Sequence, residues 1–189
     1  MANTEQEIIT RYMGDMVALE SHILQAIGMQ AKLLDDHADA QQKVKTYRDT
    51  LSNHVDALKA RLDELGGSPT HPLKEGVAAA IGVAAGLVDK MRTEEASKDL
   101  RDDYTAINHA IIAYEMMYTT AVAAGDTKTA DLCKRHLKDN AQFVMEINNF
   151  MPKLVLDELA QDGMSVKPDA LSTAQAGMRE VWSQAAQQR

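Results

Sequence analysis

The stretch VKTYRDTLSNHVDALKARLDELGGSP, residues 44–69, decides the fold class of this chain. Its apolar side chains recur three or four residues apart, the spacing that places them on one face of an α-helix. They are Val44, Tyr47, Leu51, Val55, Leu58, Leu62 and Leu65. Gly66-Gly67-Ser68-Pro69 then ends the helix, because glycine favours the backbone of a helix terminus and proline cannot continue it. The stretch predicts one long amphipathic helix with a sharp end.

The same spacing continues on both sides of this stretch and predicts further helices. The predicted helices cover about 4–34, 38–65, 72–90, 94–124, 127–161 and 168–187. Thr4 and Glu7 are spaced as a capping box, and Gly125-Asp126 and Asp162-Gly163 separate the last three helices. Pro152 is expected to kink or interrupt the helix over 127–161. Two long helix pairs joined by a crossover are typical of a four-helix bundle with ferritin-like topology.

The composition supports an all-α chain with a single domain. Only 4% of its 189 residues are aromatic, and runs of the residues that favour strands are missing. A chain of this length is expected to form one domain over 1–189. The core is expected at about 5–160, with the short C-terminal helix at about 168–187 outside it.

The charge and the single cysteine limit the partners and the location of the chain. The formal net charge is −8, from 28 acidic and 20 basic residues, which argues against nucleic-acid and anionic-membrane partners. Cys133 has no second cysteine to pair with, and the polar N-terminus lacks the apolar segment of a signal peptide. A cytoplasmic location is therefore expected. The most apolar stretch, 76–88, is too short to span a bilayer.

Polar residues interrupt the apolar stripe of each long helix. Each lies three or four positions from apolar neighbours: Glu20, His54, Glu115, His136 and, three residues after His136, Asp139. An ionised carboxylate in a low-dielectric core is costly unless it is paired or bound to a cation. Carboxylates and imidazoles on facing helices meet this need by coordinating a divalent metal ion, so an iron or manganese site is expected. A Glu–His pair across the bundle would also neutralise both side chains without a metal.

Four stretches occur in an order and spacing typical of one protein family. They are Asp15-Met-Val-Ala-Leu-Glu20, Leu62-Asp-Glu-Leu-Gly66…Pro69, Ala113-Tyr-Glu115-Met-Met-Tyr118 and Leu137-Lys-Asp139-Asn140. Over roughly 5–160 the chain thereby resembles the YciE/YciF-like stress-associated bacterial proteins of the ferritin-like superfamily. The resemblance implies a dimeric helical bundle with a two-metal centre, to which Glu20, Glu115 and Asp139 would contribute ligands.

The chain departs from the family pattern at two of these positions. The family has Leu-x-Glu-Glu where this chain has Leu137-Lys-Asp139-Asn140, and the family's carboxylate on the second helix would fall near Thr50. That ligand is missing here, and His54 is placed to compensate for it. The last helix, at about 168–187, lies outside the resemblance and is a candidate for a subunit interface.

Two functions from different classes remain open. The first is a ferritin-like, stress-associated metal protein, for which an oxidase or peroxide-scavenging reaction is conceivable because such chemistry needs open coordination positions on a redox metal. The second is a non-catalytic structural or interaction dimer whose metal site has decayed to a hydrogen-bonded polar layer. An iron-storage cage ranks below both. A homodimer is expected in either case, and no residue is singled out as catalytic.

Overall fold

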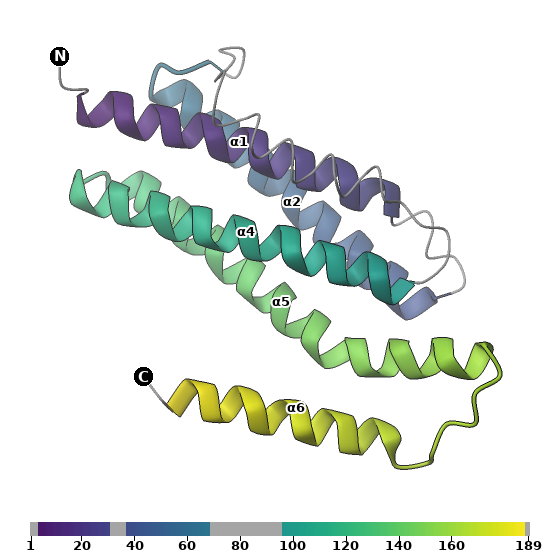
Figure 1. The fold of residues 1–189 in the computed structure, drawn as a ribbon. Helices are drawn as coiled ribbons and strands as arrows, with labels where there is room; N and C mark the ends of the chain where they lie inside the picture. Colours follow the sequence, from purple (N-terminus) through teal and green to yellow (C-terminus); the bar gives the residue numbers. More distant parts are fainter. Residues whose placement is uncertain (1–3, 31–36, 69–95, 188–189) are drawn as a thin grey trace.

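The computed structural model describes residues 4–30, 37–68 and 96–187, which are helical apart from short connections (Figure 1). The helices are α1 (Glu5–Gln30), α2 (Ala38–Glu64), α4 (Ala96–Ala123), α5 (Thr127–Gln161) and α6 (Ala170–Gln187). The predicted all-α class is confirmed, and the helix bounds lie close to the expected ones. The helix expected over about 72–90 falls outside the described residues. None of the described helices has the length and hydropathy needed to cross a membrane.

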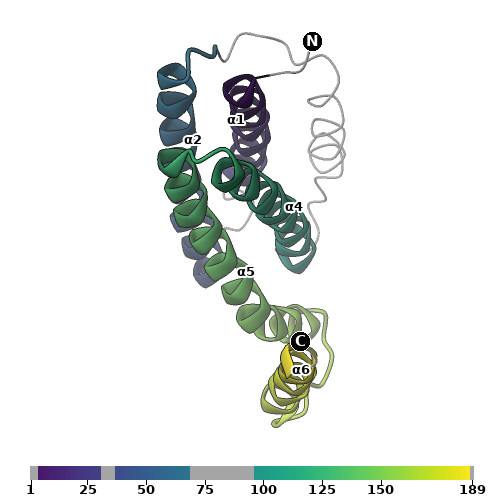
Figure 2. The same cartoon turned by 90° about the vertical axis from the view of Figure 1, so that its left-hand side faces the viewer.

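Four of these helices form the predicted bundle. Helix α1 packs along α2, α4 packs along α5, and the two pairs meet through α1 with α4 and through α2 with α5. Figure 1 shows α1 and α5 running in one direction and α2 and α4 in the other, so neighbouring helices are antiparallel. Figures 1 and 2 show α6 to one side of the bundle, beside the C-terminal part of α5. Among the described helices, the bundle interior is therefore built by α1, α2, α4 and α5.

Two glycines end helices in the left-handed conformation. Gly66, after α2, has φ +76°, and Gly125, after α4, has φ +70°. The amide after each glycine donates back to a carbonyl of the last helical turn, at 3.0 Å after Gly66 and 2.9 Å after Gly125. These are the bonds of a Schellman motif, and a side chain at such a φ is strained. Both glycines lie where the sequence predicted a helix end.

The capping box predicted at Thr4 is present, whereas the predicted break at Pro152 does not end the helix. The Glu7 amide donates to Thr4 Oγ1 at 3.2 Å, and the Thr4 amide donates to the Glu7 carboxylate at 2.7 Å, which completes the capping box. Helix α5 continues through Pro152 and bends towards its C-terminal part (Figure 1). Proline removes one backbone hydrogen bond without stopping a helix that its neighbours support. Pro152 is therefore tolerated inside α5, and the helix is not interrupted.

The inward face of α4 differs from the predicted one in its C-terminal half. The spacing of three and four also predicts Ile111 and Tyr118 inside, but both are half-buried, whereas Tyr114 and Met117 are fully buried. Glu115 is exposed, so the expectation that its side chain points into the core is wrong. Successive helical residues differ by 100° in direction, and α4 contacts both α1 and α5. Two adjacent stripes of α4 are therefore apolar, and the spacing alone does not show which of them faces the core.

Arg61 ties the end of α2 to the start of α5. Its guanidinium donates to both oxygens of Asp126 at 2.7 and 2.9 Å and to Thr129 Oγ1 at 3.0 Å. Asp126 is also the N-cap of α5, because it accepts a hydrogen bond from the Thr129 amide at 3.0 Å. One half-buried ion pair thus fixes the cap and links the two helix pairs.

The variant Arg61→Met should lower the free energy of unfolding by about 2 kcal/mol, because Asp126 loses a cation in a half-buried place. Urea denaturation followed by circular dichroism measures the change. Lys128→Met is the matched control, since Lys128 meets Glu64 at 3.4 Å on the exposed surface and should cost less than about 0.5 kcal/mol. Similar losses in both variants would contradict the role given to Arg61.

Candidate metal centre

Three of the predicted ligands meet inside the bundle. Glu20 of α1, His54 of α2 and His136 of α5 each offer one ligand atom, and these atoms lie within 4.8 Å of one another. Their exposed fractions are 0%, 3% and 5%. Each residue comes from a different helix, so the packing of the bundle brings them together. We call these three residues the buried triad.

His54 lies between two carboxylates. Its Nδ1 is 3.4 Å from Glu20 Oε1, and its Nε2 is 3.2 Å from Asp139 Oδ2. Burial lowers the pKa of His54, but the hydrogen bonds and negative charges of Glu20 and Asp139 outweigh burial and raise that pKa above its usual value. The arrangement favours an imidazolium that donates from both nitrogens in the metal-free protein.

His136 has the opposite electrostatic environment. Its ring stacks on the His54 ring, with centroids 3.7 Å apart and planes 10° from parallel. Burial, followed by the positive charges of His54 and Arg135, lowers the pKa of His136 to about 3. His136 is therefore a neutral imidazole at pH 7, which is the form that binds metals.

Tyr114 controls which nitrogen of His136 is available. Its Oη lies 2.8 Å from His136 Nδ1, and the two rings meet edge to face. Burial and the negative charge of Glu20 raise the pKa of Tyr114 well above its usual value, so the phenol keeps its proton. When His136 Nδ1 carries the imidazole proton and donates it to Tyr114, Nε2 is left with a free lone pair. The sequence predicted Glu115, rather than Tyr114, next to the residues of the buried triad.

The two remaining predicted ligands lie outside the buried triad. The Asp139 side chain is 46% exposed and contacts His54 from the solvent side of the buried triad. It also lines a groove of about 250 Å³ between α2 and α5, together with Tyr47 and Thr50. Glu115 is exposed on α4, so it is not part of the buried cluster of ligands. The structure thus brings together three of the five predicted residues and places Asp139 beside them.

The positions where a second metal would need carboxylates hold neutral side chains. Thr50 Oγ1 donates to the carbonyl of Thr46 at 3.2 Å. Asn140 is fully buried, and its Oδ1 accepts a hydrogen bond from Tyr47 Oη at 2.6 Å. The ring of Tyr47 stacks on Phe143 with centroids 3.9 Å apart. Neither position offers the carboxylate bridge on which two-metal carboxylate centres depend.

The buried triad fits one metal ion chemically. Glu20 Oε2 is buried and has no hydrogen-bond partner among the described residues. The buried triad therefore contains a carboxylate oxygen that can still accept a bond. Two imidazole nitrogens and one such oxygen are a common donor set for divalent transition metals. Bonds of about 2.1 Å keep two ligand atoms within about 4.2 Å of each other. The ligand atoms of the triad lie close to this limit, but the two imidazole planes are nearly parallel, so at least one ring must turn before both can bind one ion.

Comparisons with known proteins support the fold. A family model described as "Domain of unknown function (DUF892)" matches residues 4–160. The crystal structure of a protein from Xanthomonas campestris pv. campestris is similar to this chain with a TM-score of 0.72 and 14% identity. The similarity covers 85% of this chain and 100% of that one, and at this identity it shows the fold alone. No curated protein matches the chain.

Proposed function

The chain belongs to the DUF892 family, and we propose that it is a ferritin-like metal protein that binds one iron or manganese ion. The observation that carries the proposal is the buried triad, Glu20, His54 and His136, which joins three helices in the core. A carboxylate at 0% exposure with one unpartnered oxygen is costly in a protein without a bound cation. The resemblance to YciE/YciF-like proteins supports a role in the stress response.

Each residue would have a distinct part in binding. Glu20 would supply the charged oxygen, and His136 would supply the Nε2 that its contact with Tyr114 leaves free. His54 would release a proton before it binds, because its two carboxylate neighbours favour the imidazolium. Asp139, at the groove, would hold His54 Nε2 by a hydrogen bond or complete the ligand set. The neutral side chains of Thr50 and Asn140 favour one ion per chain over two.

A redox metal bound here with open coordination positions would supply chemistry towards oxygen species. The residues of the chain bind and orient that ion, and the apolar core around them excludes water. The groove on the α2–α5 side is lined by Asp139, which contacts His54, and not by the buried triad itself.

The second candidate function is a helical interaction protein with a hydrogen-bonded polar layer. The geometry of His54 favours it, because both ring nitrogens already have carboxylate neighbours and the ring stacks on His136. In that case the layer neutralises Glu20 without a metal, and replacing its members changes stability only.

Metal content separates the two candidates. Protein purified without chelator and then loaded with Mn²⁺ or Fe²⁺ should hold about one ion per chain, and Glu20→Gln should hold less than about a tenth of that, because it loses the only charged ligand of the buried triad. Elemental analysis after gel filtration measures the ratio. Glu20→Gln is nearly isosteric, so the fold should be kept, as a circular-dichroism melt would verify.

Glu115→Gln is the matched control, because it removes a charge from an exposed position of α4. It should keep the wild-type metal content. Trace metal in the wild type that does not change in Glu20→Gln would overturn the metal proposal and favour the polar layer. Loss of metal in Glu115→Gln alone would show that the ligand set differs from the buried triad.

A further inference from the structure

The groove between α2 and α5 contains a residue that contacts the buried triad. It has a volume of about 250 Å³ and is lined by Tyr47 and Thr50 of α2 and by Asp139, Phe143 and Glu146 of α5, among others. Figure 2 shows α2 and the first half of α5 on one side of the bundle, and α1 and α4 on the other. The groove therefore opens on the α2–α5 side.

Asp139 belongs both to this groove and to the surroundings of the buried triad. Its side chain is 46% exposed, and its Oδ2 lies 3.2 Å from His54 Nε2. Tyr114, which contacts His136 from α4, is fully buried. Two other pockets of the described structure, with volumes of about 410 and 70 Å³, contain neither Asp139 nor a member of the triad. Asp139 is therefore a contact of the triad that solvent in the groove can reach.

The side chains of the groove suit a divalent cation. Lys43, the basic residue of the groove, lies 3.8 Å from Glu146, whereas Asp139 has His54 as its ion-pair partner. Thr50 Oγ1 donates to a backbone carbonyl one turn earlier and keeps its own lone pairs for accepting. Carboxylate and hydroxyl oxygens bind hard divalent ions that keep part of their water. The net charge of −8 also raises the concentration of such ions near the chain.

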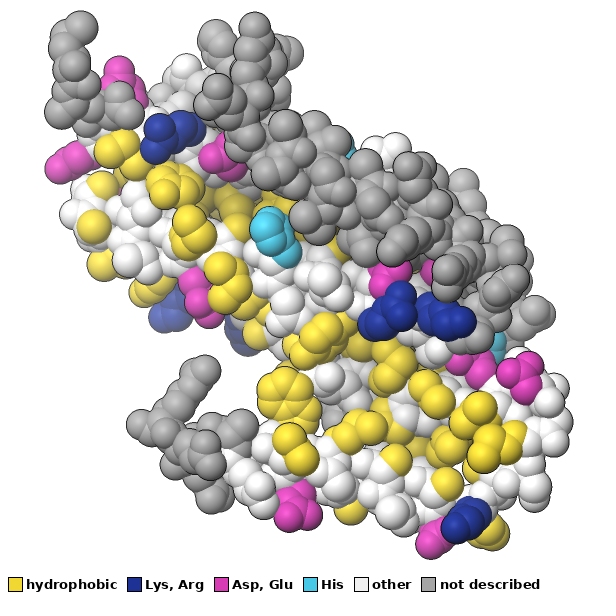
Figure 3. Space-filling view, in the orientation of Figure 1, with side chains coloured by type: hydrophobic (Ala, Val, Ile, Leu, Met, Phe, Trp, Pro, Cys, Tyr) yellow, Lys and Arg dark blue, Asp and Glu magenta, His cyan; other side chains and the backbone are white. Residues whose placement is uncertain are grey.

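The side of the molecule shown in Figure 3 differs from the groove in its side chains. Hydrophobic side chains gather there over α6 and the neighbouring part of α5, and the Asp and Glu side chains are scattered. The triad itself is at most 5% exposed, so an ion reaches it only after a side chain has moved. The groove is where such a movement would admit a cation that the surface has already collected.

His54 is the side chain that has to move. Its ring is stacked on His136 with the planes 10° from parallel, so the lone pairs of the two rings do not point at one ion. The contacts of His54 with the carboxylates on its two sides measure 3.2 and 3.4 Å. The contact that holds His136 to Tyr114 is shorter, at 2.8 Å. His54 is therefore the ring that turns more easily, and its turn breaks the hydrogen bond to Asp139.

We propose that a divalent cation enters the buried triad through this groove, and that Asp139 receives the ion and releases His54. This inference rests on the proposed function, because it supplies the route to the same site. The cation competes with His54 for the Asp139 carboxylate by virtue of its two positive charges. Once Nε2 is free the ring turns, and the ion passes to Glu20, whose buried Oε2 has no partner among the described residues. Asp139 is thus a positioning residue on the route and not a ligand of the bound ion.

Cobalt uptake measures this route directly, because Co²⁺ bound to nitrogen and oxygen ligands absorbs visible light. In stopped-flow mixing with the full chain, the observed rate should level off as the Co²⁺ concentration rises, since the ion waits at Asp139 for His54 to turn. Asp139→Asn should lower the uptake rate at low Co²⁺ about tenfold, and removal of the bound ion by a chelator should also slow about tenfold. The dissociation constant should change less than about threefold, because a residue on the route acts on entry and exit alike.

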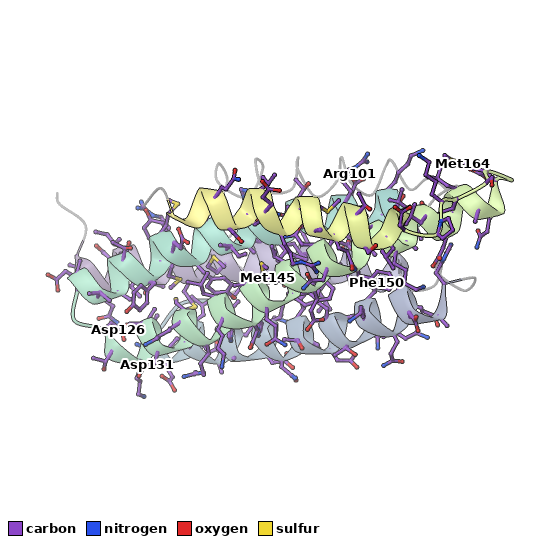
Figure 4. All side chains as sticks on the ribbon, turned by 90° about the horizontal axis from the view of Figure 1, so that it is seen from below. Arg101, Asp126, Asp131, Met145, Phe150 and Met164 are labelled. Carbon is purple, nitrogen blue, oxygen red and sulfur yellow. The ribbon has the colours of Figure 1, made fainter. Side chains whose placement is uncertain are left out.

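Lys43→Gln tests the route in the opposite direction. It leaves Glu146 without its cation at the groove, so uptake should become about threefold faster. Asp131→Asn is the matched control. Asp131, labelled in Figure 4 near the start of α5, is exposed and lies about 12 Å along the helix from Asp139. This exceeds the screening length of about 8 Å at physiological salt, so uptake should match the wild type.

The results separate the route from the metal site. Uptake at the wild-type rate in Asp139→Asn would overturn the route and leave the metal proposal standing. A raised dissociation constant with faster removal by chelator would make Asp139 a ligand of the bound ion, which also contradicts the route. A wild-type chain that binds no Co²⁺ would overturn both proposals. The three substitutions are at partly or fully exposed positions, so circular-dichroism melts should match the wild type.

Discussion

Replacing His54 by Leu is expected to lower the free energy of unfolding of the metal-free protein by about 3–5 kcal/mol. Glu20 is fully buried, and His54 Nδ1 is the hydrogen-bond partner of its Oε1, while Oε2 already has none among the described residues. Without the imidazole, the carboxylate either stays charged in a low-dielectric core or takes up a proton at a cost. Few single substitutions in this bundle should cost as much.

The double variant Glu20→Leu/His54→Leu identifies the source of this loss. It removes the buried charge together with its partner, so most of the lost stability should return. Urea denaturation in the presence of a chelator measures both variants. His109→Leu is the control, because His109 is exposed on α4. A loss below about 1 kcal/mol in His54→Leu would mean that Glu20 is neutral or hydrated in the metal-free protein.

The parts of the fold that depend on local sequence were predicted well. The α2 stripe, the helix ends at Gly66 and Gly125, and the capping box at Thr4 are present because spacing, glycine conformation and side-chain capping act within one or two turns. In its C-terminal half the inward face of α4 was predicted one residue away from its true position, because packing against two neighbours makes a wide apolar face.

The candidate site was predictable only as far as each helix could be read separately. Glu20, His54 and His136 are flanked by apolar residues within their own helices, so their inward direction follows from spacing. The stacking of His54 on His136 and the contact from Tyr114 depend on how α2, α4 and α5 are placed in space. No spacing within one helix carries that information. The exposure of Glu115 has the same origin, since it follows from the rotation of α4.

The metal-free fold should become sensitive to acid through His136. Burial and the charges of His54 and Arg135 lower its pKa from 6.5 to about 3. Below pH 6.5 His136 therefore binds a proton in the unfolded chain, whereas in the folded chain it binds that proton only near pH 3. The stability that this difference contributes is complete above pH 6.5, and it is lost at about 1.4 kcal/mol per pH unit as the pH falls.

Asp99 of α4 acts in the opposite direction. Burial, followed by the charge of Asp102, raises the pKa of Asp99 from 3.8 to about 6. The folded chain then binds a proton before the unfolded chain does, so this residue destabilises the fold at pH 7. That cost disappears as the pH falls from about 6 towards 3.8. Over this range the two residues nearly cancel, and the wild type should show only a shallow dependence on pH from them.

Single substitutions should separate these two opposing effects. Urea denaturation with chelator, between about pH 7 and pH 4, gives the free energy of unfolding of the wild type, His136→Gln and Asp99→Asn. The wild type should lose stability relative to His136→Gln as the pH falls, and gain stability relative to Asp99→Asn over the same range. Below about pH 6 His54 adds little, because the unfolded chain is mostly protonated there at the ordinary His pKa and the folded chain has a raised pKa. If the His136→Gln curve ran parallel to that of the wild type, His136 would titrate normally in the fold, and burial would not keep its imidazole neutral below pH 6.5.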